Sequence, residues 1–327
     1  MAKKSAKRAK ASSSKSSNKP AARKSSPVKK AAKSARRPGA ARTHKAAKSP
    51  GRKPARSARK ETVLPFFQVD SFTGRLFHGN PAGVVLLEKW LPAEVMQAIA
   101  AENNLAETAF VTPASGKAAQ GGTRLAIRWF TPAVEVELCG HATLAAAHVL
   151  WRHVGVQAQS LTFESASGPL QVEREKDLLV LDFPSLPGRK SADGRAVTAA
   201  LGRAPVEVYE SSCMMAVFEN KRDVHELIPD LEAIAALDTL GVIVTAPGVG
   251  HDFVSRFFAP ALGIDEDPVT GSSHCTLAPY WSARLGKAKL TAHQVSSRGG
   301  ELFCEVRGER VRIGGRAVTY LDGRIRI

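Results

Sequence analysis

From residue 63 onward, the chain consists of short apolar segments separated by Gly, Pro and Asn turns. This pattern predicts many short strands and few helices. In the first half, the predicted strands are 63–69, which we expect at a sheet edge, 82–87, 108–111, 125–130, 161–164, 170–173 and 178–183. In the second half, they are 206–209, 215–218, 241–245, 253–258, 295–297, 302–306 and 311–313. Predicted helices begin at Pro92 and near Ser272 and cover 140–151 and 231–237.

One pattern occurs twice. Residues 128–132 (Arg-Trp-Phe-Thr-Pro) are followed seven residues later by Cys139-Gly140-His141-Ala142-Thr143. Residues 256–260 (Arg-Phe-Phe-Ala-Pro), which begin 128 residues after the first copy, are followed at the same interval by Asp267-Pro268-Val269-Thr270-Gly271-Ser272. Such a period predicts an internally duplicated fold. Two helix N-termini facing one cleft would form a site for a small carboxylate.

The fold class predicted from this pattern is α+β, with two units that each wrap a curved sheet around one apolar helix. We place these units at residues 62–184 and 195–327. The Pro- and Gly-containing stretch 184–194 between them is typical of a linker.

Charge separates the N-terminal tail from the rest of the chain. Residues 1–60 hold 22 Lys/Arg and no Asp or Glu, whereas the remaining residues hold 25 Lys/Arg against 30 Asp/Glu, a formal charge of −5. The Lys/Arg/Ala/Ser/Pro-rich tail, residues 1–61, has almost no bulky apolar side chain, so we predict that it is disordered. It resembles linker-histone tails and is a candidate for non-specific nucleic-acid binding. The alternatives are a solubilising or targeting extension, and an upstream stretch wrongly included in the reading frame.

Several functional classes are not supported by the sequence. No stretch is apolar enough to span a bilayer or to form a secretory h-region, so we expect no membrane partner and a cytoplasmic protein. Nucleotide-binding glycine motifs and a nucleophile elbow are missing as well. His148 and His153 are wrongly spaced to share a metal on one helix face, and the four cysteines contain no CxxC pair. We therefore expect no metal and no organic cofactor.

Three short segments carry candidate chemistry. Glu107 stands at the start of an apolar strand, where burial would raise its pKa toward a range useful for proton transfer. Gly140 and His141 begin the Ala-rich helix and could bind an anion. Asp267, Gly271 and Ser272 have the same arrangement in the second copy. The alternatives are an ordinary loop carboxylate at Glu107 and plain helix caps at the two helix starts.

These segments resemble the PhzF family of phenazine-biosynthesis isomerase-like proteins, which have the diaminopimelate epimerase fold. The matching residues are 69–73, 79–82, 105–111, 140–143, 266–272 and 297–300, so the resemblance covers about residues 63–327. It implies two pseudo-symmetric halves, each a β-barrel around a central helix, with the site in the cleft between them. It also implies a homodimer without metal or organic cofactor.

The resemblance also implies roles for individual residues. Glu107 would move a proton, as in the isomerisation of trans-2,3-dihydro-3-hydroxyanthranilate, while His141, Asp267 and Ser272 would hold the substrate or assist. Related racemases use two thiols, but here the counterpart of Cys139 is Asp267. We therefore interpret Cys139 as a small packing residue, or a reactive thiol if the helix dipole lowers its pKa.

Our leading hypothesis is a cofactor-independent isomerase of a small carboxylic acid. Backbone N–H groups near Gly140 and Gly271, together with His141 and Ser272, would hold the carboxylate of the substrate. Asp267 would bind its amine or hydroxyl group, or tune Glu107. The alternatives are a non-catalytic small-molecule-binding protein with a nucleic-acid-binding tail, and an amino-acid epimerase or racemase.

Overall fold

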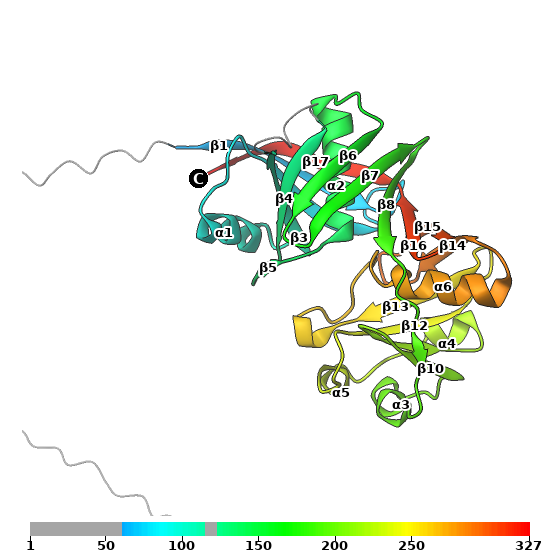
Figure 1. The fold of residues 1–327 in the computed structure, drawn as a ribbon. Helices are drawn as coiled ribbons and strands as arrows, with labels where there is room; N and C mark the ends of the chain where they lie inside the picture. The colour runs from blue at the N-terminus through cyan, green and yellow to red at the C-terminus, as the bar shows by residue number, and fades with distance from the viewer. Residues whose placement is uncertain (1–60, 115–122) are drawn as a thin grey trace, which may run out of the picture. The chain divides into compact units, whose positions relative to one another are not determined.

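The structure, a computed structural model, describes residues 61–114 and 123–327 (Figure 1). Apart from Glu61, the predicted tail lies outside the described residues, and its disorder stays a prediction. The described part has a mixed α/β fold with one 17-stranded sheet and few helices. Every helix in these ranges is too short or too polar to cross a lipid bilayer.

The first part of the chain builds eight strands and two α-helices. The strands are β1 (Val63–Ser71), β2 (Asn80–Leu86), β3 (Glu107–Pro113), β4 (Arg124–Phe130), β5 (Glu135–Val136), β6 (Ser160–Ser165), β7 (Gly168–Glu175) and β8 (Leu178–Pro184). Helix α1 (Ala93–Asn103) begins after Pro92 and ends at Asn104, a left-handed residue whose N–H donates to Ala100 O. Helix α2 (Gly140–Val149) continues as the π-helical turn η2 (Leu150–Val154).

The second part has more helices than predicted. Its strands are β9 (Arg189–Lys190), β10 (Glu207–Glu210), β11 (Met214–Val217), β12 (Val242–Pro247), β13 (Phe253–Phe258), β14 (Lys289–Gln294), β15 (Gly300–Arg307), β16 (Arg310–Gly315) and β17 (Ala317–Arg326). Its helices are α3 (Arg195–Leu201), α4 (Lys221–His225), α5 (Leu231–Ala235), the 3-10 turn η3 (Pro260–Leu262) and α6 (His274–Leu285). The sequence pattern missed α3 and α4, which are short.

The order of strand pairing repeats along the chain. In the first part, β1–β2 and β3–β4 are antiparallel, β2–β3 and β4–β6 are parallel, and β6–β7–β8 is an antiparallel series. In the second part, β10–β11 and β12–β13 are antiparallel, β11–β12 and β13–β14 are parallel, and β14–β15–β16 is antiparallel. The repeated sequence pattern thus accompanies a repeated order of pairing.

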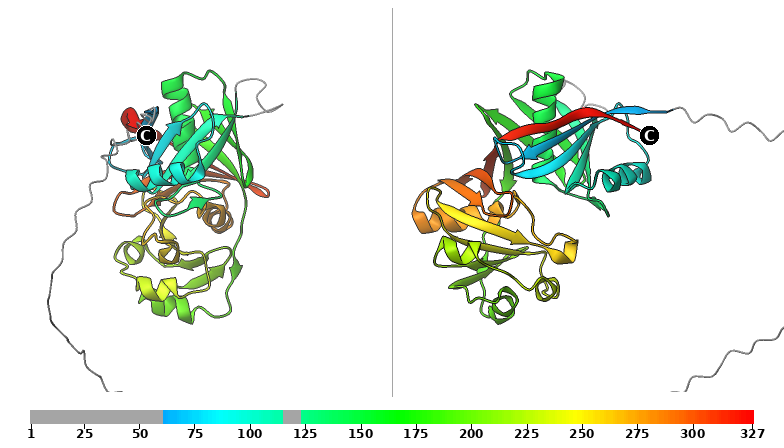
Figure 2. Two further views of the ribbon diagram at one scale, coloured as in Figure 1. Left: turned by 90° about the vertical axis from the view of Figure 1, so that its left-hand side faces the viewer. Right: turned by 180° about the vertical axis from the view of Figure 1, so that it is seen from behind.

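Two further pairings connect the ends of the chain. Strand β17 pairs antiparallel with β1, and Figure 2 shows the two side by side in red and blue. Strand β16 pairs antiparallel with β8. The prediction that β1 is an edge strand is therefore wrong, because β1 has β2 on one side and β17 on the other. The predicted strand 295–297 is also wrong, because β14 ends at Gln294 and a turn follows. The predicted domain boundaries stay a prediction.

Helix α2 is packed among strands of the first part (Figure 1). It contacts β1, β2, β3, β8 and β17, and eight of its ten residues are buried. Alanines fill four of these eight positions, and their small side chains let the strands approach the helix closely. The same hydrophobic cluster includes Leu277 and Trp281 of α6, so one core is shared by the two halves.

The turn before β2 is fixed by a glycine. Gly79 has a φ of +67°, and a Cβ on it would lie 2.1 Å from the Ser71 carbonyl oxygen. The N–H of Gly79 donates to Gly299 O, and its carbonyl accepts from Nε of Arg298. Nη2 of the same arginine donates to Asp70 Oδ1 at 2.8 Å. A loop of the C-terminal part therefore holds the turn from which Asn80 begins β2.

Candidate functional site

Glu107 lies where sequence reasoning placed it, at the start of a strand. It is the first residue of β3 and pairs in register with Ala82 of the neighbouring parallel strand β2. Only 8% of its surface is exposed. A carboxylate held on a central strand can move little, so its partners are set by the segments that pack over it.

The start of α2 brings His141 to this carboxylate. Cys139 caps the helix in an extended conformation, and its carbonyl accepts from the N–H and the Oγ1 hydroxyl of Thr143. The Ser71 hydroxyl donates to the carbonyl of His141 at 2.8 Å, which ties this first turn to β1. His141 is 5% exposed.

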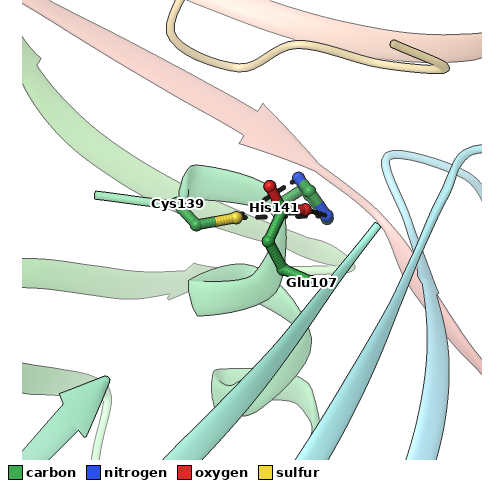
Figure 3. Close-up of side chains that lie close together, drawn as sticks. All are labelled: Glu107, Cys139 and His141. Atoms are coloured by element: carbon green, nitrogen blue, oxygen red, sulfur yellow. Dashed lines mark hydrogen bonds and ion pairs between the residues drawn. The ribbon is translucent and has the colours of Figure 1, made fainter. Parts of the chain in front are cut away.

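Glu107, Cys139 and His141 point toward one another (Figure 3). Glu107 Oε2 lies 3.0 Å from His141 Nε2, and Cys139 Sγ lies 3.5 Å from His141 Nδ1. The Glu107–His141 contact is a charge pair without hydrogen-bond alignment, since Oε2 has no hydrogen-bond partner among the described residues. We call these three side chains the Glu107 cluster. Each offers a metal-ligating atom, and these atoms all lie within 4.8 Å of one another.

Asp267 reaches the same place from the second copy of the repeat, through Asn80. The fully buried Asn80 side chain donates from Nδ2 to Asp267 Oδ1 at 2.7 Å and to Val269 O at 2.9 Å, and the same nitrogen lies 3.3 Å from His141 Nδ1. The amide of Gln294 fixes the loop, donating to Asp267 O and accepting from the N–H of Thr270. The start of α2 and the loop at Asp267 therefore meet at the side-chain amide of Asn80.

The pKa of Glu107 is shifted in the direction opposite to the one predicted from the sequence. Burial raises its pKa, but the positive charge of His141 and close polar contacts with His141 and Cys139 outweigh burial, so the pKa of Glu107 lies below its ordinary value. The predicted rise is therefore wrong. Its cause, an imidazole 34 positions along the chain, cannot be inferred from the apolar surroundings of Glu107 alone.

Cys139 and His141, in contrast, both have raised pKa values and keep their protons at neutral pH. Burial lowers the pKa of His141, but its interactions with Cys139 and Glu107 outweigh burial and raise this pKa well above 6.5. The pKa of the Cys139 thiol is itself raised, first by burial and then by Glu107. At neutral pH Cys139 is thus a thiol, and Glu107 is the anion that keeps His141 charged. The helix dipole does not produce the reactive thiolate that we considered.

Asp267 is the carboxyl group whose pKa is raised. Burial raises it to about 6, and Glu107 adds to the rise, while His141 and hydrogen bonds from Thr270 and Asn80 oppose it. A carboxyl with this pKa can exchange a proton near neutral pH. The pKa values of Glu107 and Asp267 are therefore shifted in opposite directions.

The remaining predicted residues lie at the two helix starts. Gly140 is the first residue of α2, whereas Gly271 and Ser272 precede α6, which begins two residues later than predicted, at His274. Gly271 is buried against Phe72, and Ser272 is exposed. No side-chain hydrogen bond joins Ser272 to the Glu107 cluster among the described residues.

Asn80 was missed as a site residue. It was given no role from the sequence, although it lies within the 79–82 match to the PhzF family. The available signal was its position directly after Gly79, a glycine in the left-handed conformation, at the first residue of β2.

The three residues of the Glu107 cluster are buried, each with 5–8% of its surface exposed. Four hollows of the described surface, with volumes of about 370 to 560 Å³, are lined by other residues, and Glu107, His141 and Asp267 line none of these four. The open cleft between the two helix starts that we expected is therefore not among these hollows.

The fold is similar to that of PhzF-family and epimerase-like structures. The structure of a predicted epimerase from Pseudomonas aeruginosa, 22% identical, matches with a TM-score of 0.61 and covers 80% of this chain and 99% of that chain. A PhzF family protein from Enterococcus faecalis, 46% identical, matches with a TM-score of 0.77 over 81% of this chain and 99% of that chain.

Sequence comparison identifies the family. An uncharacterized isomerase of P. aeruginosa is 52% identical over 265 residues, which cover 81% of this chain and 99% of that protein. The family model described as phenazine biosynthesis-like protein matches residues 69–323. The chain belongs to this phenazine biosynthesis-like, or PhzC-PhzF, family.

The raised pKa of Asp267 has a measurable effect on stability. The pKa of Asp267 is about 6 in the folded protein and that of an unfolded-chain Asp is about 3.9. Between these values the unfolded chain releases a proton that the folded protein keeps, so the stability contributed by Asp267 is lost as the pH rises through this window. We expect the unfolding free energy of Asp267→Asn, relative to wild type, to rise by about 2–3 kcal/mol between about pH 4 and pH 7.

Urea denaturation at several pH values measures this difference. Asp265→Asn is the matched control, because Asp265 is exposed in the same loop. A wild-type-to-Asp267→Asn difference that does not change with pH would contradict the shift.

Proposed function

We propose that this protein is a cofactor-independent isomerase that shifts a proton within a small carboxylic acid. The observation that carries the proposal is the meeting of Glu107, His141 and Asp267 through Asn80 in one buried place. An ionised carboxylate, an imidazolium and a carboxyl titrating near neutral pH are a set of groups that can accept and return a proton. The isomerase names of close relatives support the same reaction class.

Glu107 is the proposed base. Its contact with His141 keeps it ionised, and therefore able to accept a proton, in the absence of substrate. A substrate that separates Glu107 from His141 leaves the carboxylate buried without its counter-charge, which raises its pKa and its basicity. The ion pair thus keeps Glu107 ionised until the substrate separates it from His141.

The other site residues are proposed to hold the substrate. Free N–H groups at the start of α2 near Gly140, together with His141, suit the carboxylate, and Gly271 and Ser272 are proposed to act at the start of the second helix. Asp267, held by Asn80, would bind an amine or hydroxyl group or return the proton. The cluster is buried, so orientation of the substrate in a dry site supplies much of the rate.

The family resemblance also leads us to propose a substrate, an oligomeric state, a location and a domain arrangement. We propose a substrate similar to trans-2,3-dihydro-3-hydroxyanthranilate, a homodimer, a cytoplasmic location, and two pseudo-symmetric barrel-like halves. The repeated order of strand pairing supports the last of these. Two-thiol racemisation is not favoured, because Asp267 occupies the place opposite Cys139. A purely binding role is not favoured either, since binding alone gives no reason to bury Glu107 beside His141.

Glu107→Gln tests the proposed base, because the amide keeps the shape of the side chain and cannot accept the proton. Deuterium incorporation at carbon is followed by NMR in D2O with trans-2,3-dihydro-3-hydroxyanthranilate and a panel of small cyclic and amino carboxylic acids. For the acids that the wild type exchanges, we expect the variant to be slower by about 10²–10⁴-fold.

Glu102→Gln is the control, since Glu102 is exposed near the end of α1 and loses the same charge. An exchange rate of Glu107→Gln within a few-fold of wild type would refute the assignment.

A second function is proposed for the tail, on the basis of its charge. Twenty-two Lys/Arg within residues 1–60, without one acidic residue, favour contact with nucleic-acid phosphates. The remainder of the chain carries a formal charge of −5 and should not bind them. Aromatic residues are missing from residues 1–60, so stacking on bases is not expected.

Electrophoretic mobility shift of duplex DNA tests the tail. We expect the full chain to retard DNA at low salt and to lose binding steeply as salt rises, because each phosphate contact releases counterions. A chain beginning at Thr62, and a full-length variant with the tail Lys/Arg changed to Gln, should not retard DNA. Equal retardation by all three would remove the tail hypothesis.

A further inference from the structure

The donor atoms of the Glu107 cluster have the chemistry of a metal site. Within residues 61–114 and 123–327, this is the one group in which three His, Cys, Asp or Glu side chains bring ligand atoms within 4.8 Å of one another. It combines a sulfur, an imidazole nitrogen and a carboxylate oxygen, which are the three ligand types that Zn²⁺ accepts. Neither the family nor the proposed proton transfer calls for an ion here.

The spacing of these atoms suits a tetrahedral ion. With metal–ligand bonds of about 2.0–2.3 Å, the ligands of a tetrahedral site lie about 3.3–3.8 Å apart. Glu107 Oε2 and His141 Nε2 are 3.0 Å apart, and Cys139 Sγ lies 3.5 and 4.0 Å from the two ring nitrogens of His141. All three atoms lie within 4.8 Å of one another, so side-chain shifts of about 1 Å or less would bring them onto one ion.

The charges around the cluster favour a cation. Glu107 Oε2 is buried without a hydrogen-bond partner among the described residues, so one acceptor atom is available to a ligand. Asp267 adds a second carboxyl group, held beside His141 by Asn80. A dication would replace the protons of the imidazolium and the thiol, releasing both as it binds.

We propose that the Glu107 cluster binds one soft divalent cation, Zn²⁺ or Cd²⁺, through Cys139 Sγ, a ring nitrogen of His141 and a carboxylate oxygen of Glu107. The fourth position is left to water, as in zinc sites with three protein ligands. The thiol selects against Mg²⁺ and Ca²⁺, which prefer oxygen ligands. Because ligation requires deprotonated Cys and His, binding strengthens as the pH rises. If Glu107 is the base, as the proposed function holds, the ion inhibits turnover by occupying it.

Cadmium titration of the reduced full-length protein tests the site, since each Cd–thiolate bond gives an ultraviolet charge-transfer band. We expect one ion per chain, a band that Cys139→Ser abolishes, and binding weakened roughly tenfold or more in Glu107→Gln. Cys213→Ser is the matched control, because Cys213 is a thiol outside the cluster that is only partly buried. Millimolar Mg²⁺ should not compete.

A band that survives in Cys139→Ser, or that disappears in Cys213→Ser, overturns the proposal. X-ray absorption of the zinc-loaded wild type needs no variant, and we expect one sulfur at about 2.3 Å with nitrogen and oxygen ligands at about 2.0 Å. A zinc shell without sulfur, or with several sulfurs, also overturns it. The result is separable from the proposed function, because metal binding can fail while Glu107→Gln still abolishes proton exchange.

Discussion

The site depends on the electrostatic balance of three titratable groups that are buried together. A single buried carboxylate would cost several kcal/mol or become protonated. Here the charge of His141 compensates Glu107, whereas at Asp267 burial outweighs the opposing charge of His141 and raises the pKa. The protonation state of each group therefore depends on the other two, so a substitution at any one of these residues shifts the pKa values of the others.

The surrounding fold maintains this balance by fixing distances. Glu107 is held on a central strand and His141 on the first turn of a helix packed among strands. Asp267 lies on a loop whose backbone is bound by Gln294 and whose carboxylate is bound by Asn80. Asn80 follows a glycine turn that Arg298 ties to the C-terminal part of the chain. Catalysis by proton transfer requires such fixed geometry, since small displacements of the reacting groups are costly in rate.

The sequence predicted much of the framework, and the reasons for its failures are physical. The apolar segments identified most of the strands, and Pro92 marked the start of α1. Alternation of apolar residues cannot show that β17 pairs with β1, because that pairing spans the whole chain. The repeat indicated that His141 and Asp267 would face one cleft, and the family resemblance added Glu107. It could not predict the lowered pKa of Glu107 or the bridging role of Asn80, because both depend on contacts within a few ångströms.

The charge of His141 tests the account most directly, because the ion pair requires an imidazolium in the interior. ¹⁵N NMR of the histidine side chains, assigned with His141→Asn, reports the protonation of both ring nitrogens as a function of pH. The account predicts that His141 is doubly protonated at neutral pH and titrates well above 6.5. A neutral His141 ring at neutral pH would contradict it.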